Sequence, residues 1–362
     1  MRVTEEVLRE LVFGGGLLGG GGGGCLDEGL KLGQLALQIG TPRVIRLEDL
    51  QSKQLVATVA LVGAPAAAGA RVRPVDYWRS LQLLLECSQP PPAGIITNEC
   101  GSVACVNGLV QSALSGLPVV DAPCNGRAHP TGMMGAMGLH RRPGYLSLQA
   151  AAGGDPDSGR YLELVVRGSL ATAAAVIRAA AIQAGGLVAV ARNPVEAVWV
   201  GQHGAPGALR MARELGRLML TAGTPKEKAE QVAHRLGGDC WGPASMRDYR
   251  IQTRGGFDVG WLELEREGLT AQIHFCNEYL VLEMQQRRLA TFPDLIATID
   301  AETGRPVTSC EVKDKTVWLV WAPARSLALG SGMKDPELFR PLENAIGTSL
   351  VQYVFGMEGG QQ

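Results

Sequence analysis

The sequence is poor in aromatic residues and carries almost no net charge. Phe, Trp and Tyr make up 5% of its 362 residues, and 34 basic residues balance 35 acidic ones, for a net charge of −1. So few aromatic side chains offer no stacking platform for nucleic acid bases. Balanced charge gives no general attraction to nucleic acid or to an anionic membrane surface. We therefore expect neither of these as a partner.

The sequence also lacks a long hydrophobic run and a secretory signal. The most apolar stretch, residues 169–186, is short and interrupted by Arg178, so it predicts a buried or half-buried helix rather than a membrane span. Residues 1–13 alternate charge with leucine and valine in a helical rhythm. They lack the uncharged apolar core and small-residue cleavage site that a signal peptide requires. We expect a cytoplasmic protein.

None of the eight cysteines belongs to a CxxC pair, and they are spread too thinly for a disulfide framework. We expect most of them to be buried free thiols. Cys124 with His129, and His274 with Cys276, are weak metal signals because no two further ligands are obvious. We predict no metal ligands, keep a metallohydrolase as an alternative, and leave the cofactor unknown.

The pattern of segments predicts two domains, because 362 residues exceed what one hydrophobic core usually supports. Helix-like and strand-like segments alternate over the first 150 residues, which indicates an α/β domain with a mainly parallel sheet. Beyond Gly255 the segments are β-rich, which indicates a second, α+β domain. We place the first domain, with its Gly-rich loop, at residues 1–155 and the second at 160–362.

The most unusual stretch holds nine glycines between Gly14 and Gly24. Residues 14–19 match G-x-G-x-x-G literally, but a dinucleotide site needs a strand before the motif and the preceding segment is helical in rhythm. The absence of a following Lys-Ser/Thr excludes a Walker A loop. A flexible tether and a tight loop before helix 26–39 remain. The tight loop would present backbone N–H groups to an anionic or carbonyl-bearing ligand.

Polar residues follow three of the predicted strands, 54–65, 93–99 and 117–122. Ligands of an open α/β sheet bind beyond the carboxyl ends of its strands, so these ends predict a cleft. The residues at or just after the strand ends are Gly63, Ala64, Pro65, Asn98, Glu99, Asp121, Asn125, Arg127 and His129. In the expected helix 103–116, Asn107 either binds a ligand amide or packs internally. Cys100 is either an activated thiol near that helix start or a small buried one.

These stretches together resemble the S-methyl-thiohydantoin desulfurase-like family, long catalogued only as a domain of unknown function. Some members are fused to, or neighbours of, hydantoinase/oxoprolinase-type proteins. The resemblance is carried, in the family's order, by LGGGGGGCL (18–26), GAP (63–65), ECGSVACVN (99–107), DAPCNGRAHPT (121–131), RGGFDVG (254–260), NE (277–278) and PDLIATID (293–300). It favours the close-approach loop over the tether. The chain departs from the family pattern at Cys25, Pro123 and Thr131, where the family carries acids.

The resemblance implies an enzyme whose small-molecule substrate is a cyclic thiohydantoin or hydantoin. Water would add to the ring carbon that bears the S-methyl group, and methanethiol would leave. Glu99 or Asp121 would act as general base, and Arg127 would stabilise developing charge together with loop N–H groups. The remaining expected site residues are Glu278, which orients groups or relays protons, and the substrate-holding Gly21, Gly22, Gly23, Gly24, Asn107 and Asn277.

The three lost acids favour an alternative of another class. In that alternative the chain is a non-catalytic accessory or binding subunit of a hydantoinase-type partner. The apolar, Ala-rich second domain is also compatible with a homo-oligomer.

Overall fold

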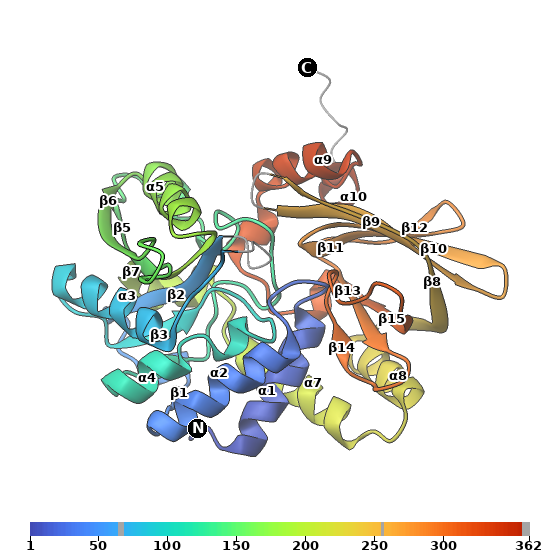
Figure 1. The fold of residues 1–362 in the computed structure, drawn as a ribbon, viewed down its shortest axis with the longest axis horizontal. Coiled ribbons are helices and arrows are strands. Elements are labelled where there is room, and N and C mark those ends of the chain that lie inside the picture. The colour runs from blue at the N-terminus through green and yellow to red at the C-terminus, as the bar shows by residue number, and fades with distance from the viewer. Residues whose placement is uncertain (64–68, 255–256, 357–362) are drawn as a thin grey trace.

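Two β-sheets, with helices around and between them, make up the architecture (Figure 1). The computed structural model describes residues 1–63, 69–254 and 257–356. The first sheet has seven strands in the order β1-β4-β3-β2-β7-β5-β6. Its strands are β1 (Val44–Ile45), β2 (Leu55–Gly63), β3 (Gly94–Thr97), β4 (Val119–Val120), β5 (Ser147–Gly153), β6 (Leu162–Gly168) and β7 (Leu187–Glu196).

The first sheet is mixed rather than mainly parallel. Strands β1, β4, β3 and β2 run parallel, as the alternation of helices and strands predicts. The pairs of β2 with β7, β7 with β5, and β5 with β6 are antiparallel. For β5 and β6 the physical reason is connection length, because the short segment 154–161 joins them and parallel neighbours need a longer crossover. The domain boundary at 155–160 stays a prediction, and the first sheet itself extends past it to Glu196.

The second sheet is antiparallel and lies in the C-terminal region, as the β-rich pattern predicts. Its order is β12-β11-β10-β9-β8-β15-β13-β14. Its strands are β8 (Asp239–Arg254), β9 (Phe257–Arg266), β10 (Leu269–Cys276), β11 (Glu278–Met284), β12 (Arg287–Thr291), β13 (Leu295–Asp300), β14 (Pro306–Val307) and β15 (Thr316–Ala322).

Helices cover the sheets and fill the space between them (Figure 1). The α-helices are α1 (Glu5–Leu18), α2 (Leu26–Ile39), α3 (Pro74–Cys87), α4 (Leu109–Ser115), α5 (Leu170–Gln183), α6 (Ala197–His203), α7 (Ala208–Thr221), α8 (Pro225–Leu236), α9 (Arg340–Ile346) and α10 (Val351–Phe355). The apolar stretch 169–186 forms α5, half-buried as expected. Among the described residues, no helix has both the length and the apolar character to cross a membrane.

The single helix expected over 103–116 is divided in two. A short 3-10 turn covers Ala104–Val106, and α4 begins only at Leu109. Between them Asn107 is extended and Gly108 has φ +111°, a left-handed conformation that glycine adopts without steric cost. The sequence pattern missed this break because the apolar spacing continues across it.

The first glycines of the run belong to a helix crossing rather than to a loop. Helix α1 continues through Gly14–Gly16 and packs against α7. A Cβ atom on Gly14 would lie 1.7 Å from the carbonyl oxygen of Ala212, and one on Gly216 would lie 1.7 Å from the carbonyl oxygen of Glu10. The absence of side chains therefore allows the two helix backbones to touch.

Ion pairs also connect the two helices at this crossing. Glu10, buried on α1, accepts hydrogen bonds from Arg213 at 2.5 Å and from Arg217 at 3.0 Å, both on α7. Helix α1 also contacts β13 and β14 of the second sheet. It therefore fixes the position of the loop that follows it relative to both halves of the molecule.

Adding one methyl group at the helix crossing is expected to destabilise the protein. Gly216→Ala forces a Cβ into the backbone of α1, and overpacking of this kind lowers the free energy of unfolding by about 1–3 kcal/mol. Gly168→Ala is the matched control, because a Cβ there meets nothing within 4 Å. Urea denaturation of both variants measures the difference. Equal stability of the two variants would contradict the close helix contact.

Candidate functional site

The loop between α1 and α2 is built from glycine because its backbone passes over large side chains. Gly20, Gly21, Gly23 and Gly24 have φ values of +52°, +91°, +75° and +86°. A Cβ on Gly20 would lie 2.5 Å from Arg127 Nη2, and one on Gly22 would lie 2.1 Å from Glu278 Oε1. Both the backbone conformation and the available space therefore require glycine here.

Hydrogen bonds from the segment after β3 and from β11 hold this loop. The carbonyl of Gly20 accepts from Tyr279 N at 2.7 Å, and that of Gly23 accepts from Val103 N at 3.0 Å. Within the described residues, the N–H groups of Gly21 and Gly23 donate to no acceptor. The loop thus lies against the segment after β3 on one side and β11 on the other.

Glu99 follows β3 and lies in a small polar network. Its Oε2 accepts from His129 N at 3.2 Å and lies 3.4 Å from His129 Nε2. Asn98 Nδ2 lies 3.3 Å from the same ring nitrogen, and Asn98 Oδ1 accepts from Arg192 Nη2 at 2.7 Å. The Glu99 side chain keeps 16% of its surface exposed, whereas His129 and Arg192 are buried. Glu99 is therefore a carboxyl group of this network that solvent can reach.

Arg127 is completely buried and joins the two halves of the molecule. Its Nη1 donates to the carbonyl oxygens of Pro293 and Asp294, and its Nε donates to Ala128 O at 3.2 Å. The guanidinium lies 4.6 Å from the centre of the Phe292 ring, a cation–π arrangement. Its Nη2 has no hydrogen-bond partner in the described part of the chain.

The two carboxyl groups of the site, Glu99 and Glu278, both have a raised pKa. Burial raises the pKa of Glu99 to about 7, although the His129 amide and Arg192 oppose the shift. Burial, followed by the charge of Glu99, raises the pKa of Glu278 well above its usual value. Burial lowers the pKa of Arg127 to about 10, so it stays a cation at neutral pH. The cluster therefore combines two carboxyl groups with raised pKa values and a cation, all largely buried.

Several polar atoms of this cluster have no partner. In the described part of the chain, Glu278 Oε2, Arg127 Nη2 and His129 Nδ1 are buried without a hydrogen bond. Buried polar atoms are almost always paired in proteins, so atoms left without a partner indicate a place for a ligand or water. We call Glu99, Arg127 and Glu278, with loop residues 20–23, the acid–arginine cluster.

Asp121 does not contact this cluster and instead begins a helix. Its Oδ1 accepts from Leu209 N at 2.7 Å, and its carbonyl accepts from Gly207 N. These bonds satisfy N–H groups at the start of α7, a place where a carboxylate is favoured. Of the residues expected to meet at the strand ends, Glu99 and Arg127 lie near one another. The Asp121 side chain points toward α7 instead.

The two expected asparagines also have internal partners. Asn107 Oδ1 accepts from Gln111 Nε2 at 3.2 Å within the segment leading to α4. Asn277 has φ +59°, and its Oδ1 accepts from Asp258 N at 2.9 Å. Their expected contact with substrate stays a prediction.

The cysteines in this region are buried thiols. A hydrogen bond with Cys105, together with burial, raises the pKa of Cys100 well above its usual value, which is the opposite of activation. Within residues 1–63, 69–254 and 257–356, no three His, Cys, Asp or Glu side chains gather as a ligand set for a metal ion. Ala64, Pro65, Gly255 and Gly256, which belong to two of the sequence motifs, lie outside the described residues.

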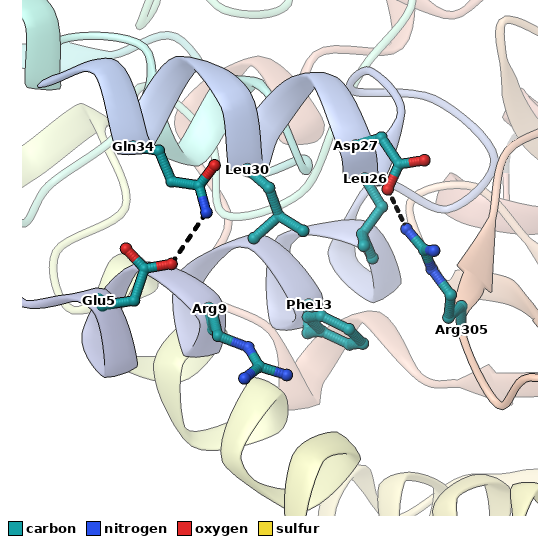
Figure 2. Close-up of a pocket in the computed structure, with 8 residues that line it drawn as sticks. All are labelled: Glu5, Arg9, Phe13, Leu26, Asp27, Leu30, Gln34 and Arg305. Atoms are coloured by element: carbon teal, nitrogen blue, oxygen red, sulfur yellow. Dashed lines mark hydrogen bonds and ion pairs between the residues drawn. The ribbon is translucent and has the colours of Figure 1, made fainter. Parts of the chain in front are cut away.

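A surface pocket between α1 and α2 is separate from the cluster. Figure 2 shows its two ends, where Gln34 donates to Glu5 and Arg305 donates to Asp27. Its lining consists of Glu5, Arg9, Phe13, Leu26, Asp27, Leu30, Gln34 and Arg305. None of the predicted site residues is among them.

The fold and the cluster define a two-sheet α/β protein with a buried carboxyl pair beside a glycine loop. Family models described as S-Me-THD-like, N-terminal domain and S-Me-THD-like, C-terminal domain match residues 6–155 and 169–330. The chain belongs to this S-Me-THD-like family, the S-methyl-thiohydantoin desulfurase-like family whose motifs the sequence resembles. The resemblance is thereby confirmed.

Other comparisons add the fold alone. The search of curated proteins gave no match. An X-ray crystal structure of a protein from Chromobacterium violaceum is similar, with a TM-score of 0.70 and 21% sequence identity. The match covers 95% of this chain and 97% of that one. The whole two-sheet arrangement therefore occurs in another protein of low sequence identity.

Arg192 is the residue of this region that the sequence analysis missed. It lies in β7 and ends the apolar run of residues 186–191. A basic residue inside an otherwise buried strand was the available signal, because arginine is rarely buried without a specific partner.

The pKa of Glu99 predicts how stability changes with pH. Its folded-state value of about 7 lies above its ordinary value of 4.5, so the folded state favours the neutral form. Stability from this group is complete below pH 4.5 and is lost as pH rises through 7. Glu99→Gln has no proton to lose. At each pH, the free energy of unfolding of wild type is subtracted from that of Glu99→Gln. This difference should rise by about 3 kcal/mol between pH 4.5 and 8.5.

Glu86→Gln provides the control because Glu86 is exposed. Its difference from wild type gives the background against which the change in Glu99→Gln is measured. Chemical denaturation at several pH values measures both variants. A constant difference for Glu99→Gln would show that Glu99 ionises as an ordinary carboxyl group.

Proposed function

We propose that this protein hydrolyses an S-methyl-thiohydantoin ring and releases methanethiol. Membership of the family supports a thiohydantoin-related role. The observation that carries the proposal is the acid–arginine cluster, in which Arg127 Nη2 and Glu278 Oε2 are buried without partners. A flat polar ring with acceptor nitrogen and carbonyl oxygen atoms would satisfy both.

In the proposed reaction Glu99 is the general base. Its pKa of about 7 still leaves part of it ionised at neutral pH, and the rise from the ordinary value gives that ionised form more affinity for a proton from water. The water oxygen bonds to the ring carbon that bears the S-methyl group. The electron pair of the C=N bond moves to the ring nitrogen, which takes a proton from neutral Glu278. The product of this step is a tetrahedral carbon that bears both hydroxyl and thioether groups.

The second step restores both carboxyl groups. The hydroxyl proton passes to Glu278, the C=O bond forms, and the C–S bond breaks. The thiolate leaves with the proton held by Glu99 as methanethiol. Water and the S-methyl-thiohydantoin thus become a hydantoin and methanethiol, with no oxidant or reductant consumed. Arg127 and the free N–H groups of Gly21 and Gly23 stabilise the negative charge that develops on the ring as the C=N electron pair moves.

A second candidate is the accessory subunit of a hydantoinase-type partner. It is favoured by Cys25, which stands directly after the glycine loop where the family carries an acid. Burial raises the pKa of this thiol to about 11, so it supplies no negative charge at neutral pH. Purification from the native host distinguishes the two candidates, because a stoichiometric hydantoinase-type partner with no activity of the chain alone would support the accessory role.

Substitution of Glu99 tests the catalytic proposal. Glu99→Gln removes the base and is expected to lower kcat/KM at least 100-fold, the usual range for a positioned general base. For wild type, kcat/KM should rise with pH through about 7 as Glu99 loses its proton. Ultraviolet absorbance and thiol release from an S-methyl-thiohydantoin measure the rate.

Asp121→Asn is the matched control, since Asp121 caps α7 and does not contact the cluster. Its kcat/KM is expected to stay within about tenfold of wild type, while circular dichroism reports the fold of both variants. Loss of activity in Asp121→Asn with activity retained in Glu99→Gln would overturn the assignment of the base.

A further inference from the structure

The outer edge of the first sheet is a strand with one open side. Strand β6 comes last in the order of that sheet and pairs with β5 alone, and Figure 1 shows it at the outer end of the sheet. Within the described part of the chain, no backbone group of residues 162–168 forms a hydrogen bond on the opposite side. An open edge of this kind is a template on which another strand can pair.

Strand β6 also lacks the features that usually protect an edge. The other three edge strands of the described chain are short or irregular. Strands β1 and β14 have two residues each, and β12 has five, with a break in its register against β11. Strand β6 has seven residues in unbroken register with β5, and it contains neither proline nor lysine. Because short strands, bulges, proline and lysine are what block edge pairing, β6 is the edge on which a further strand fits.

The side chains of β6 make the strand complementary to a second copy of itself. Glu163, Val165 and Arg167 alternate along the strand, so they share one face, and all three are exposed. In an antiparallel pair centred on Val165, Glu163 of each copy lies directly opposite Arg167 of the other. A centre at Leu164 or Val166 removes both of these pairs. Charge therefore favours one register and one orientation.

Both charged groups can take part in such a pair. Arg167 donates to the carbonyl of Cys87 at 3.3 Å and has no carboxylate partner within the described residues. Glu163 accepts from Arg79 at 2.9 Å and remains exposed. In the paired arrangement Glu163 would lie between Arg79 of its own chain and Arg167 of the second copy, which adds a cation to a carboxylate that already has one.

Helix α5, which packs on β5 and β6, has an outer side without charge. Its one charged residue, Arg178, lies over the ring of Phe257, 5.3 Å from the ring centre. A helix at a protein surface normally carries charged side chains toward solvent. The exposed residues of α5 are Ala171, Thr172, Ala175, Val176, Ala179, Ile182 and Gln183. Val176 and Ile182 expose 41% and 68% of their surface, so this side of the helix is suited to being covered.

We propose that two copies of this chain associate through β6 and join their first sheets into one continuous sheet. The two-fold axis passes at Val165, perpendicular to the sheet, so each Glu163–Arg167 contact occurs twice. Both copies of α5 then lie on the same face, on either side of the new strand pair. No residue of the acid–arginine cluster lies in β6 or α5, so this inference is independent of the proposed hydrolysis.

Charge reversal tests the register of this pairing. In sedimentation experiments at micromolar concentration, wild type is expected to have twice the mass of one chain. Glu163→Arg and Arg167→Glu each place like charges opposite one another, and each is expected to weaken self-association at least about tenfold. An equimolar mixture of the two variants should restore the dimer, because every contact then joins an acid to a base. Arg287→Glu, exposed on the edge strand β12, is the matched control and should leave the mass unchanged.

Three results would overturn the proposal. These are a wild type that stays monomeric, a dimer that survives both charge reversals, and a mixture of the two variants that fails to associate. Circular dichroism establishes that each variant is folded. If one is not, hydrogen exchange of wild type decides, because amides of residues 162–168 should exchange more slowly in the dimer than in the dilute monomer. Unchanged exchange in this strand while a dimer forms would place the interface elsewhere.

Discussion

The buried charge of Arg127 is the constraint on which the site depends. A guanidinium removed from water is costly unless hydrogen bonds and nearby charges compensate it. Here the carbonyls of Pro293 and Asp294 and the ring of Phe292 compensate it from the second half of the chain. The glycine loop lies against its remaining face, which is possible only because Gly20 has no side chain. The position of the loop and the proximity of the carboxyl groups follow from this one placement, whereas burial raises the pKa values of Glu99 and Glu278 against the charge of Arg127.

The sequence predicts the parts of this arrangement that obey a local rule. Polar residues after parallel strands predict that Glu99 and Arg127 lie near one another, and their charges do interact in the structure. The β-rich segments predict the second sheet. Asp121 obeys the same strand-end rule, yet its carboxylate is used by the start of α7. That outcome depends on where a helix almost ninety residues later packs, and no local pattern encodes it. Arg192 was missed for a related reason, because it follows the apolar run of residues 187–191 in β7.

The nine glycines illustrate a second limit of sequence reasoning. They look like one motif but serve two physical purposes. Gly14–Gly16 are helical and allow α1 to touch its neighbours closely, whereas Gly20–Gly24 turn the chain over charged side chains. Composition is the same in both parts, and only the partners differ. Pro123 and Thr131 stand where the family carries acids. In this chain their backbone carbonyls accept hydrogen bonds from Ala205 N and Met134 N.

The crossing of α1 with α7 has a consequence for how the family can vary. Because two helix backbones meet there without side chains between them, the halves cannot rotate about this contact without colliding. Glu99 comes from one half and Glu278 from the other. An exchange of either half with that of a distant relative would therefore misplace one acid, even if both halves folded. The two parts are expected to be inherited as a single unit, with changes on one side matched by changes on the other.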